Sequence, residues 1–120
     1  MQWLEQLPQS LDDIACAAQK LLALGSEMVV ISLGAEGAML AHASGCWFAQ
    51  PPPLHARNPI GAGDVMSAGL IDGWRRGLAL PDMVRWATAL ASASVLTLES
   101  GAVEVATARE LEKRVTVKQL

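Results

Sequence analysis

Residues 58–70 read Asn-Pro-Ile-Gly-Ala-Gly-Asp-Val-Met-Ser-Ala-Gly-Leu and are the most informative segment of this chain. The small residues Gly61, Ala62 and Gly63 leave backbone N–H groups uncovered just before an expected helix. The free N–H groups and positive dipole end of a helix attract an anion, most often phosphate. Asp64 beside such a site is electrostatically unfavourable unless it has a task, such as accepting a proton from an attacking hydroxyl. The segment is therefore typical of a kinase.

A second glycine turn lies upstream, at residues 32–37, and reads Ser-Leu-Gly-Ala-Glu-Gly. It follows Met28–Leu33, a continuous apolar run that predicts a strand covered on both faces, as in a parallel sheet. Open α/β sheets bind their ligands just past the carboxyl ends of strands. Each turn also has a plainer interpretation. The first can simply end a strand, and the second can be a helix N-cap formed by Asp64.

Two common nucleotide motifs are excluded at both turns. No Gly-Lys-Ser/Thr follows either turn, so neither is a Walker loop. The third glycine of a dinucleotide fingerprint would fall on Met66, and a proline-rich loop leads into that segment where the fingerprint needs a strand.

The remaining pattern predicts an α/β protein without enough strands for a complete sheet. The expected elements are a helix capped by Ser10 and ended by Gly25, the strand Met28–Leu33, a hairpin of Ala38–Ala41 and Cys46–Ala49, a proline-rich loop up to Pro59, a helix Val65–Arg76, a helix from Pro81 to about Leu98, a short helix opened by a Thr107–Glu110 capping box, and a final strand Val115–Val117.

Composition bounds the function classes. The chain has 120 residues, 52% of them hydrophobic, and a formal net charge of −3, which suits one domain and no nucleic-acid surface. The longest uncharged apolar run, Trp86–Leu98, is too short to span a bilayer. No secretory leader is visible, and Cys16 and Cys46 lack metal-like spacing. We expect two buried, reduced thiols in a cytoplasmic protein.

At this point the residues match a known family. Gly61-Ala62-Gly63-Asp64, followed by Ser67-Ala68-Gly69, resembles the second signature of the ribokinase-like (PfkB) carbohydrate kinases. The upstream turn resembles that family's nucleotide-phosphate turn, and its distance from the signature is the expected one. Val29–Leu120 looks like the family's closing segment throughout. Ala87–Leu98 and the ending Val115–Leu120 look most like the branch of 1-phosphofructokinase and tagatose-6-phosphate kinase.

The resemblance implies a fold and residue roles. Residues 1–120 would be the C-terminal part of a ribokinase-like three-layer α/β/α fold, with an incomplete sheet and no lid. Asp64 would be the general base, and the amides of Gly61, Ala62 and Gly63 would hold the transferring phosphoryl group. Thr88 would line the adenine pocket, and Mg²⁺ would accompany ATP. The turn against the nucleotide phosphates would consist of Ser32, Leu33, Gly34, Ala35, Glu36 and Gly37.

The sequence departs from the family pattern in three respects. The family's N-terminal sheet, sugar-contacting residues and strand lid are absent. Members that use a monovalent cation commonly carry Asp two residues before the position of Ile60, and here that residue is Asn58. The family's Asn-x-x-Glu motif, tied to Mg²⁺, would fall near the start of the chain, where Trp3 replaces its Glu and Glu5 is a weak substitute.

These observations favour transfer of the γ-phosphoryl group of ATP to a sugar or sugar-phosphate hydroxyl, performed as part of a complete PfkB-type kinase. Two alternatives stay open. The chain could be a non-catalytic remnant that binds nucleotide or a partner chain, because an unpaired edge strand favours dimers. It could equally belong to a nucleoside kinase of the same superfamily, which shares every motif named above.

Overall fold

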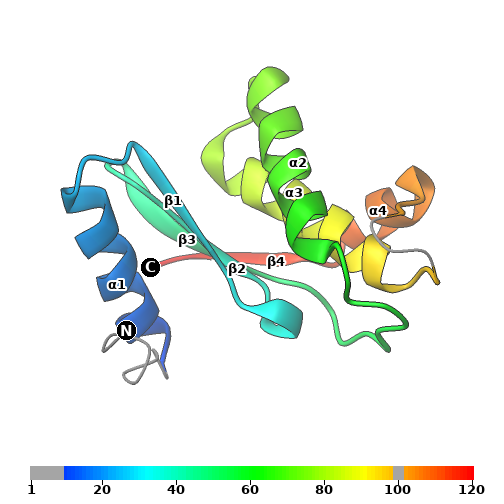
Figure 1. Cartoon of the computed structure of the whole chain (residues 1–120). Coiled ribbons are helices and arrows are strands. Elements are labelled where there is room, and N and C mark those ends of the chain that lie inside the picture. Colours follow the sequence, from blue (N-terminus) through cyan, green and yellow to red (C-terminus); the bar gives the residue numbers. More distant parts are fainter. Residues whose placement is uncertain (1–9, 99–101) are drawn as a thin grey trace.

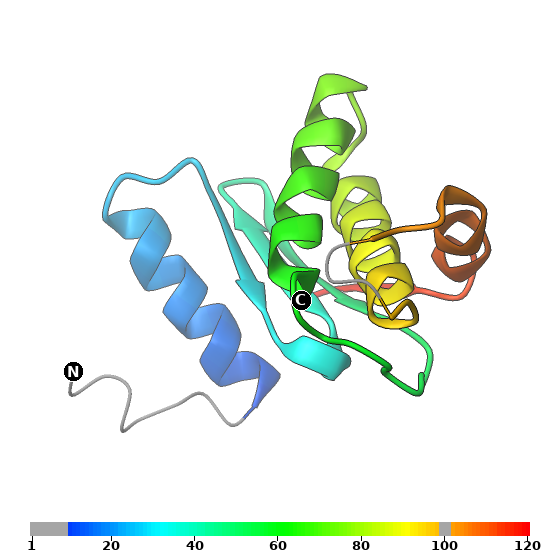
Figure 2. The ribbon, with the colours of Figure 1, turned by 45° about the vertical axis from the view of Figure 1, so that its right-hand side comes forward.

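The computed structural model describes residues 10–98 and 102–120 and arranges them in three layers (Figure 1). A four-stranded sheet forms the middle layer, with α1 (Leu11–Ala23) on one face. On the other face lie α2 (Ala62–Arg75), α3 (Leu80–Val95) and α4 (Val105–Glu112). Figure 2 shows α3 between α2 and α4. The α/β class expected from the sequence is confirmed.

The sheet has the order β1-β2-β3-β4, formed by β1 (Met28–Ser32), β2 (Ala38–His42), β3 (Gly45–Gln50) and β4 (Thr116–Gln119). All three pairings are antiparallel. The expectation of a parallel sheet around Met28–Leu33 is therefore wrong for the described part of the chain, where β1 pairs only with β2. A continuous apolar run indicates that both faces of a strand are buried, but it does not indicate whether the neighbouring strand is parallel or antiparallel.

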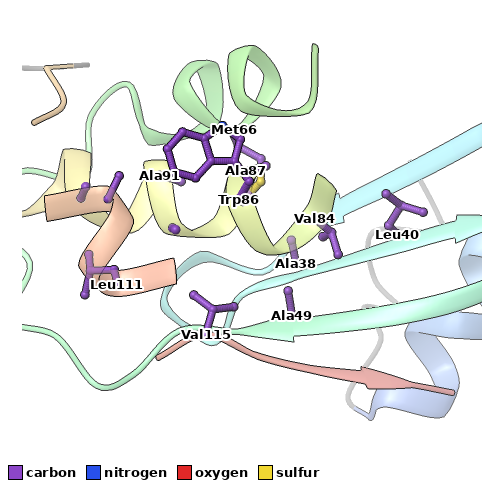
Figure 3. Close-up of a cluster of buried hydrophobic side chains, with 13 residues drawn as sticks. Ala38, Leu40, Ala49, Met66, Val84, Trp86, Ala87, Ala91, Leu111 and Val115 are labelled. Carbon is purple, nitrogen blue, oxygen red and sulfur yellow. The ribbon is translucent and has the colours of Figure 1, made fainter. Parts of the chain in front are cut away.

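Both faces of the sheet are covered, which explains the apolar run. In β1, Val29 and Ile31 pack with the cluster under α1, while Val30 packs with the cluster under α3. β2 divides in the same way, and its first four residues are fully buried. The larger cluster fills the space between α3 and the sheet, where Figure 3 shows Ala38, Ala49 and Val115. Burial of each larger apolar side chain contributes about 1.5–3 kcal/mol.

Small residues let α2 pack directly on α3. Gly69 and Gly73 are buried on the face of α2 that meets α3. A Cβ built on Gly73 would lie 3.1 Å from the Cγ of Met83, which is closer than an ordinary van der Waals contact. Met66 and Trp86 complete this part of the core (Figure 3). Glycine weakens a helix in isolation, so its presence here reflects the close approach of the two helices.

Two helix starts agree with the sequence. The hydroxyl of Ser10 accepts a hydrogen bond of 3.1 Å from the Asp13 N–H and caps α1. Pro81 lies in the first turn of α3. The hairpin and the closing strand are also present, the latter as β4.

The other two helix starts differ from the sequence expectation. α2 begins one turn early, at Ala62, because Gly61 serves as its N-cap. The prediction of a Thr107–Glu110 capping box is wrong, since α4 begins at Val105 with Glu104 as N-cap. Thr107 lies inside the first turn, and its hydroxyl donates to Glu104 Oε2 at 3.3 Å.

Cys46 is buried, and its burial raises the pKa of the thiol. Cys16 is exposed, so the expectation of two buried thiols is half wrong. The expectations for Trp3 and Glu5 lie outside the described residues. None of the helices in the described part of the chain has the length and hydropathy that crossing a membrane would need.

Candidate functional site

Both glycine turns line one cavity of about 320 Å³. The upstream turn and the start of α2 form opposite parts of its wall, and α3 contributes a third part. The remaining wall comes from the proline-rich loop. The lining residues that had been expected in a site are Ser32, Gly34, Ala35, Gly37, Ala62, Gly63 and Thr88.

The upstream turn is held in shape by its own backbone. The Leu33 N–H donates to the Gly37 carbonyl at 2.8 Å, and the Gly37 N–H donates to the Gly34 carbonyl at 3.2 Å. Both glycines have positive φ angles, +62° at Gly34 and +118° at Gly37. A Cβ on Gly37 would collide with the Ala49 carbonyl oxygen, whereas a Cβ on Gly34 would meet nothing within 4 Å. Packing on β3 therefore explains Gly37, and Gly34 leaves the turn open.

The start of α2 forms a second open backbone surface, the glycine loop, defined here as Ile60–Gly63. Gly61 adopts a φ of +88°, and its carbonyl accepts the Val65 N–H at 3.0 Å. The Ala62 N–H donates to the Pro59 carbonyl at 3.2 Å. Gly63 is the second residue of the helix, and a Cβ there would meet nothing within 4 Å. Helix N–H groups at this position lack intrahelical partners and can bind an anion.

Asp64 is the third residue of α2 and is exposed, directly after the glycine loop. Because Gly61 is the N-cap, the interpretation of Asp64 as the N-cap is wrong. An acidic side chain in the first turn also favours the helix dipole. The residue is open to solvent and not sealed in packing.

Thr88 presents a buried polar atom at the cavity. The residue is only 1% exposed, and its Oγ1 has no hydrogen-bond partner among the described residues. A buried hydroxyl without a partner costs about 1–3 kcal/mol. A polar atom of a ligand in the cavity would remove that cost.

Four of the expected residues do not line this cavity, namely Leu33, Glu36, Gly61 and Asp64. Glu36 instead lines a neighbouring open hollow together with Gln50 and Arg114. The two spaces adjoin, because Ala35 and two prolines line both. Among the described residues, no three His, Cys, Asp or Glu side chains are grouped to hold a metal ion.

Asn58 takes part in the site in a way that sequence reasoning missed. Its Oδ1 accepts a hydrogen bond of 3.0 Å from the Ile60 N–H, and its Nδ2 donates to the Leu98 carbonyl at 3.2 Å. The residue had been singled out only as a departure from a family pattern. Its partner is 40 positions away, so no local signal could have identified the contact.

Comparisons with known proteins show which family the chain belongs to. Residues 1–106 match the family described as pfkB family carbohydrate kinase. The chain is 43% identical over 90 residues to 1-phosphofructokinase of Escherichia coli K12, a match that spans 75% of this chain and 28% of that protein. It is 32% identical over 119 residues to 1-phosphofructokinase of Vibrio cholerae, spanning 99% of this chain and 38% of that protein.

The fold is similar to that of solved kinases. It superposes on phosphofructokinase-2 of Escherichia coli in complex with potassium with a TM-score of 0.82 and 28% identity, covering 88% of this chain and 34% of that one. This chain belongs to the pfkB family of carbohydrate kinases, and it spans 28–38% of the length of the two 1-phosphofructokinases named above.

Proposed function

We propose that residues 1–120 are the C-terminal, nucleotide-binding and catalytic-base portion of a ribokinase-like kinase. The complete enzyme would transfer the γ-phosphoryl group of ATP to a hydroxyl of a sugar or sugar phosphate. The observation that carries this proposal is the single cavity lined by Gly34 of the upstream turn and Gly63 of the glycine loop. The 1-phosphofructokinases among its relatives favour a sugar phosphate as the acceptor.

The cavity fits a nucleotide in size and chemistry. Its volume of about 320 Å³ lies within the range of small-molecule sites, roughly 300–1,000 Å³. The phosphates would lie along the Ser32–Gly37 turn, and the buried hydroxyl of Thr88 would gain a partner on the adenine side. Mg²⁺ would be held mainly by phosphate oxygens and water, as is usual for this ion.

Asp64 would act as the general base. Its exposed carboxylate follows the glycine loop directly, so a hydroxyl that attacks a phosphoryl group held at the loop could pass its proton to Asp64. The amides of Gly61 and Gly63 would stabilise charge on the transferring group, whereas the Ala62 N–H donates to the Pro59 carbonyl in this structure. Donors of this kind contribute about 10²–10³ in rate. Positioning of the two substrates supplies most of the remaining acceleration.

Replacement of Asp64 tests the proposed role. We expect Asp64→Asn to lower phosphoryl transfer by about 10²–10⁴-fold, with ADP affinity changed less than about threefold. Asp82→Asn is the matched control, because Asp82 is also an exposed acid in the first turn of a helix, here α3. The assay is a panel of sugars, sugar phosphates and nucleosides, with calorimetric ADP titration beside it. Transfer by Asp64→Asn at a near wild-type rate would exclude the role.

A second candidate function, binding of a partner chain without phosphoryl transfer, is favoured by the surface beside β1. In the described part of the chain, the edge of β1 away from β2 pairs with no strand. Two large apolar side chains on α2 are also exposed, Ile71 at 66% and Trp74 at 74%. Free strand edges and exposed apolar patches are the usual features of association surfaces.

Sedimentation measurements test this second candidate. If α2 and β1 form such a surface, the wild-type chain should self-associate as its concentration rises, and Trp74→Arg should weaken that association at least tenfold. Leu24→Arg is the control, since Leu24 is 82% exposed at the end of α1 and lies outside this surface. A chain that stays monomeric at all concentrations would count against association through this surface.

A further inference from the structure

The segment before the glycine loop is tied to the end of α3 through the backbone. The N–H groups of Arg57 and Asn58 both donate to the Val95 carbonyl, at 2.6 and 3.0 Å. Val95 is the last residue of α3 and lines the cavity. The chain therefore reaches the glycine loop from a point anchored on the helix that also carries Thr88.

The side chain of Asn58 extends this anchor to the loop itself. Its Oδ1 accepts the Ile60 N–H at 3.0 Å, and its Nδ2 donates to the Leu98 carbonyl at 3.2 Å. One amide group thus joins the first residue of the glycine loop to the segment that follows α3. It uses both its acceptor oxygen and a donor N–H, which lie on separate atoms of the neutral amide group.

Packing does not hold the loop in place. The side chain of Ile60 is 68% exposed, and Pro59 is exposed as well. Gly61 and Gly63 have no side chains to bury. Hydrogen bonds must therefore determine where the loop lies, and Asn58 makes the contact that joins the loop to the end of α3.

We propose that Asn58 is a positioning residue that sets the distance between the glycine loop and the Thr88 wall of the cavity. This inference rests on the proposed function, because the spacing matters when one ligand contacts both walls. Asn58 itself does not line the cavity, so its effect on the ligand is indirect. Loss of its side chain should leave the fold in place and loosen the loop.

The test combines titration of a non-hydrolysable ATP analogue with amide hydrogen exchange of Ile60 in the full chain. We expect Asn58→Ala to weaken the affinity for this analogue about threefold to tenfold, the range for one or two hydrogen bonds, and to speed Ile60 exchange. Asn58→Asp keeps the acceptor for Ile60 and loses the donor to Leu98, so it should restore slow Ile60 exchange. His55→Ala, an exposed site in the same segment and outside the cavity wall, is the control and should change neither measurement.

The two readouts separate failure of this inference from failure of the proposed function. If the wild-type chain does not bind the ATP analogue, the nucleotide proposal fails, while Ile60 exchange still decides whether Asn58 holds the loop. Wild-type affinity for the analogue together with wild-type exchange in Asn58→Ala would overturn the inference. The inference would also be overturned if Ile60 exchanged as fast in Asn58→Asp as in Asn58→Ala. In that case the oxygen at position 58 would not control the position of Ile60, and the side chain would have only a structural role.

Discussion

Gly69 in α2 and Ala87 in α3 lie in direct backbone contact. A Cβ built on Gly69 would stand 2.8 Å from the Cα of Ala87, a separation that real side chains do not adopt. Met66 precedes Gly69 by about one turn of α2, and Thr88 follows Ala87, and both line the cavity. The crossing of the two helices therefore brings α2 next to the part of α3 that carries Thr88.

Gly69→Ala should destabilise the protein. The added methyl group cannot fit without separating α2 from α3, and overpacking of this kind costs about 1–3 kcal/mol. Denaturant unfolding, followed by the fluorescence of the buried Trp86, measures the effect. Ala68→Ser is the control on the exposed side of the same helix. Equal stability of Gly69→Ala and wild type would show that the helices do not meet as closely as described.

Gly63→Ala should have the opposite effect on stability. Gly63 has a helical conformation, and a Cβ there meets nothing within 4 Å. Alanine is favoured over glycine within a helix by up to about 1 kcal/mol, so the free energy of unfolding should stay equal or rise. The same methyl group would occupy the space proposed for the transferring phosphoryl group, and calorimetry should show the affinity for a non-hydrolysable ATP analogue falling at least tenfold. Unchanged affinity would place the phosphates elsewhere.

Asp72 joins the end of α2 to α3. Its carboxylate accepts a hydrogen bond from Arg75 Nη2 at 2.8 Å and from Trp86 Nε1 at 3.1 Å, and it pairs with Arg76 Nε at 3.1 Å. The Arg76 guanidinium also lies 5.2 Å from the centroid of the Trp86 ring. The hydrogen bond from Arg75 is the main cause that holds the pKa of Asp72 below its ordinary value, and the bond from Trp86 and the charges of Arg76 and Arg75 act in the same direction.

This lowered pKa gives stability a pH dependence. The folded-state pKa of Asp72 lies below its unfolded value of about 3.9, so the stabilisation is complete above about pH 4. It is lost as the pH falls from there through the folded-state pKa. Asp72→Asn should therefore lower the melting temperature at pH 7 and flatten its decline below pH 4. Glu27→Gln, at an exposed position before β1, is the control, and an identical acid decline in Asp72→Asn would contradict the assignment.

The hydrogen bonds of Asn58 also lead to a prediction for the effect of monovalent cations on ADP affinity. The Leu98 carbonyl already accepts an N–H of the Asn58 amide, and a donor group cannot coordinate a cation. ADP affinity should therefore be equal in potassium chloride and choline chloride at the same ionic strength. In Asn58→Asp a carboxylate would face the Leu98 carbonyl, two oxygens that suit a hard cation, and potassium should then tighten ADP binding. A wild-type chain that needs potassium would contradict this view of Asn58.

Local chemistry made much of the fold predictable. Ser10 predicts the start of α1, and Ser44-Gly45 predicts the turn between β2 and β3. Both features could be predicted because a helix cap and a tight turn depend on residues within a few positions. The capping-box signal at Thr107 failed because Glu104 competes for the same helix start. The direction of pairing of β1 could not be predicted, since it depends on which strand lies beside it in space.

Only those parts of the candidate site that need a particular backbone conformation could be predicted from the sequence. Gly34 and Gly63 can be recognised in the sequence because glycine lowers the stability of a helix or strand, so its presence there indicates a structural or functional requirement. Their common cavity depends on contacts between distant segments, and the sequence indicated it only through resemblance to a family. Neither the buried hydroxyl of Thr88 nor the contact of Asn58 with Leu98 has a sequence signal, because each depends on the packing of α3.

The central claim is that one nucleotide contacts both glycine turns, and an NMR titration of the chain with a non-hydrolysable ATP analogue and Mg²⁺ tests it most directly. The account predicts that the amide resonances of Gly34 and Gly63 and the methyl resonance of Thr88 shift together along one binding curve. Gly25, which lies in the turn between α1 and β1, should not shift. Shifts at only one of the two turns, or at neither while the analogue binds, would contradict the claim.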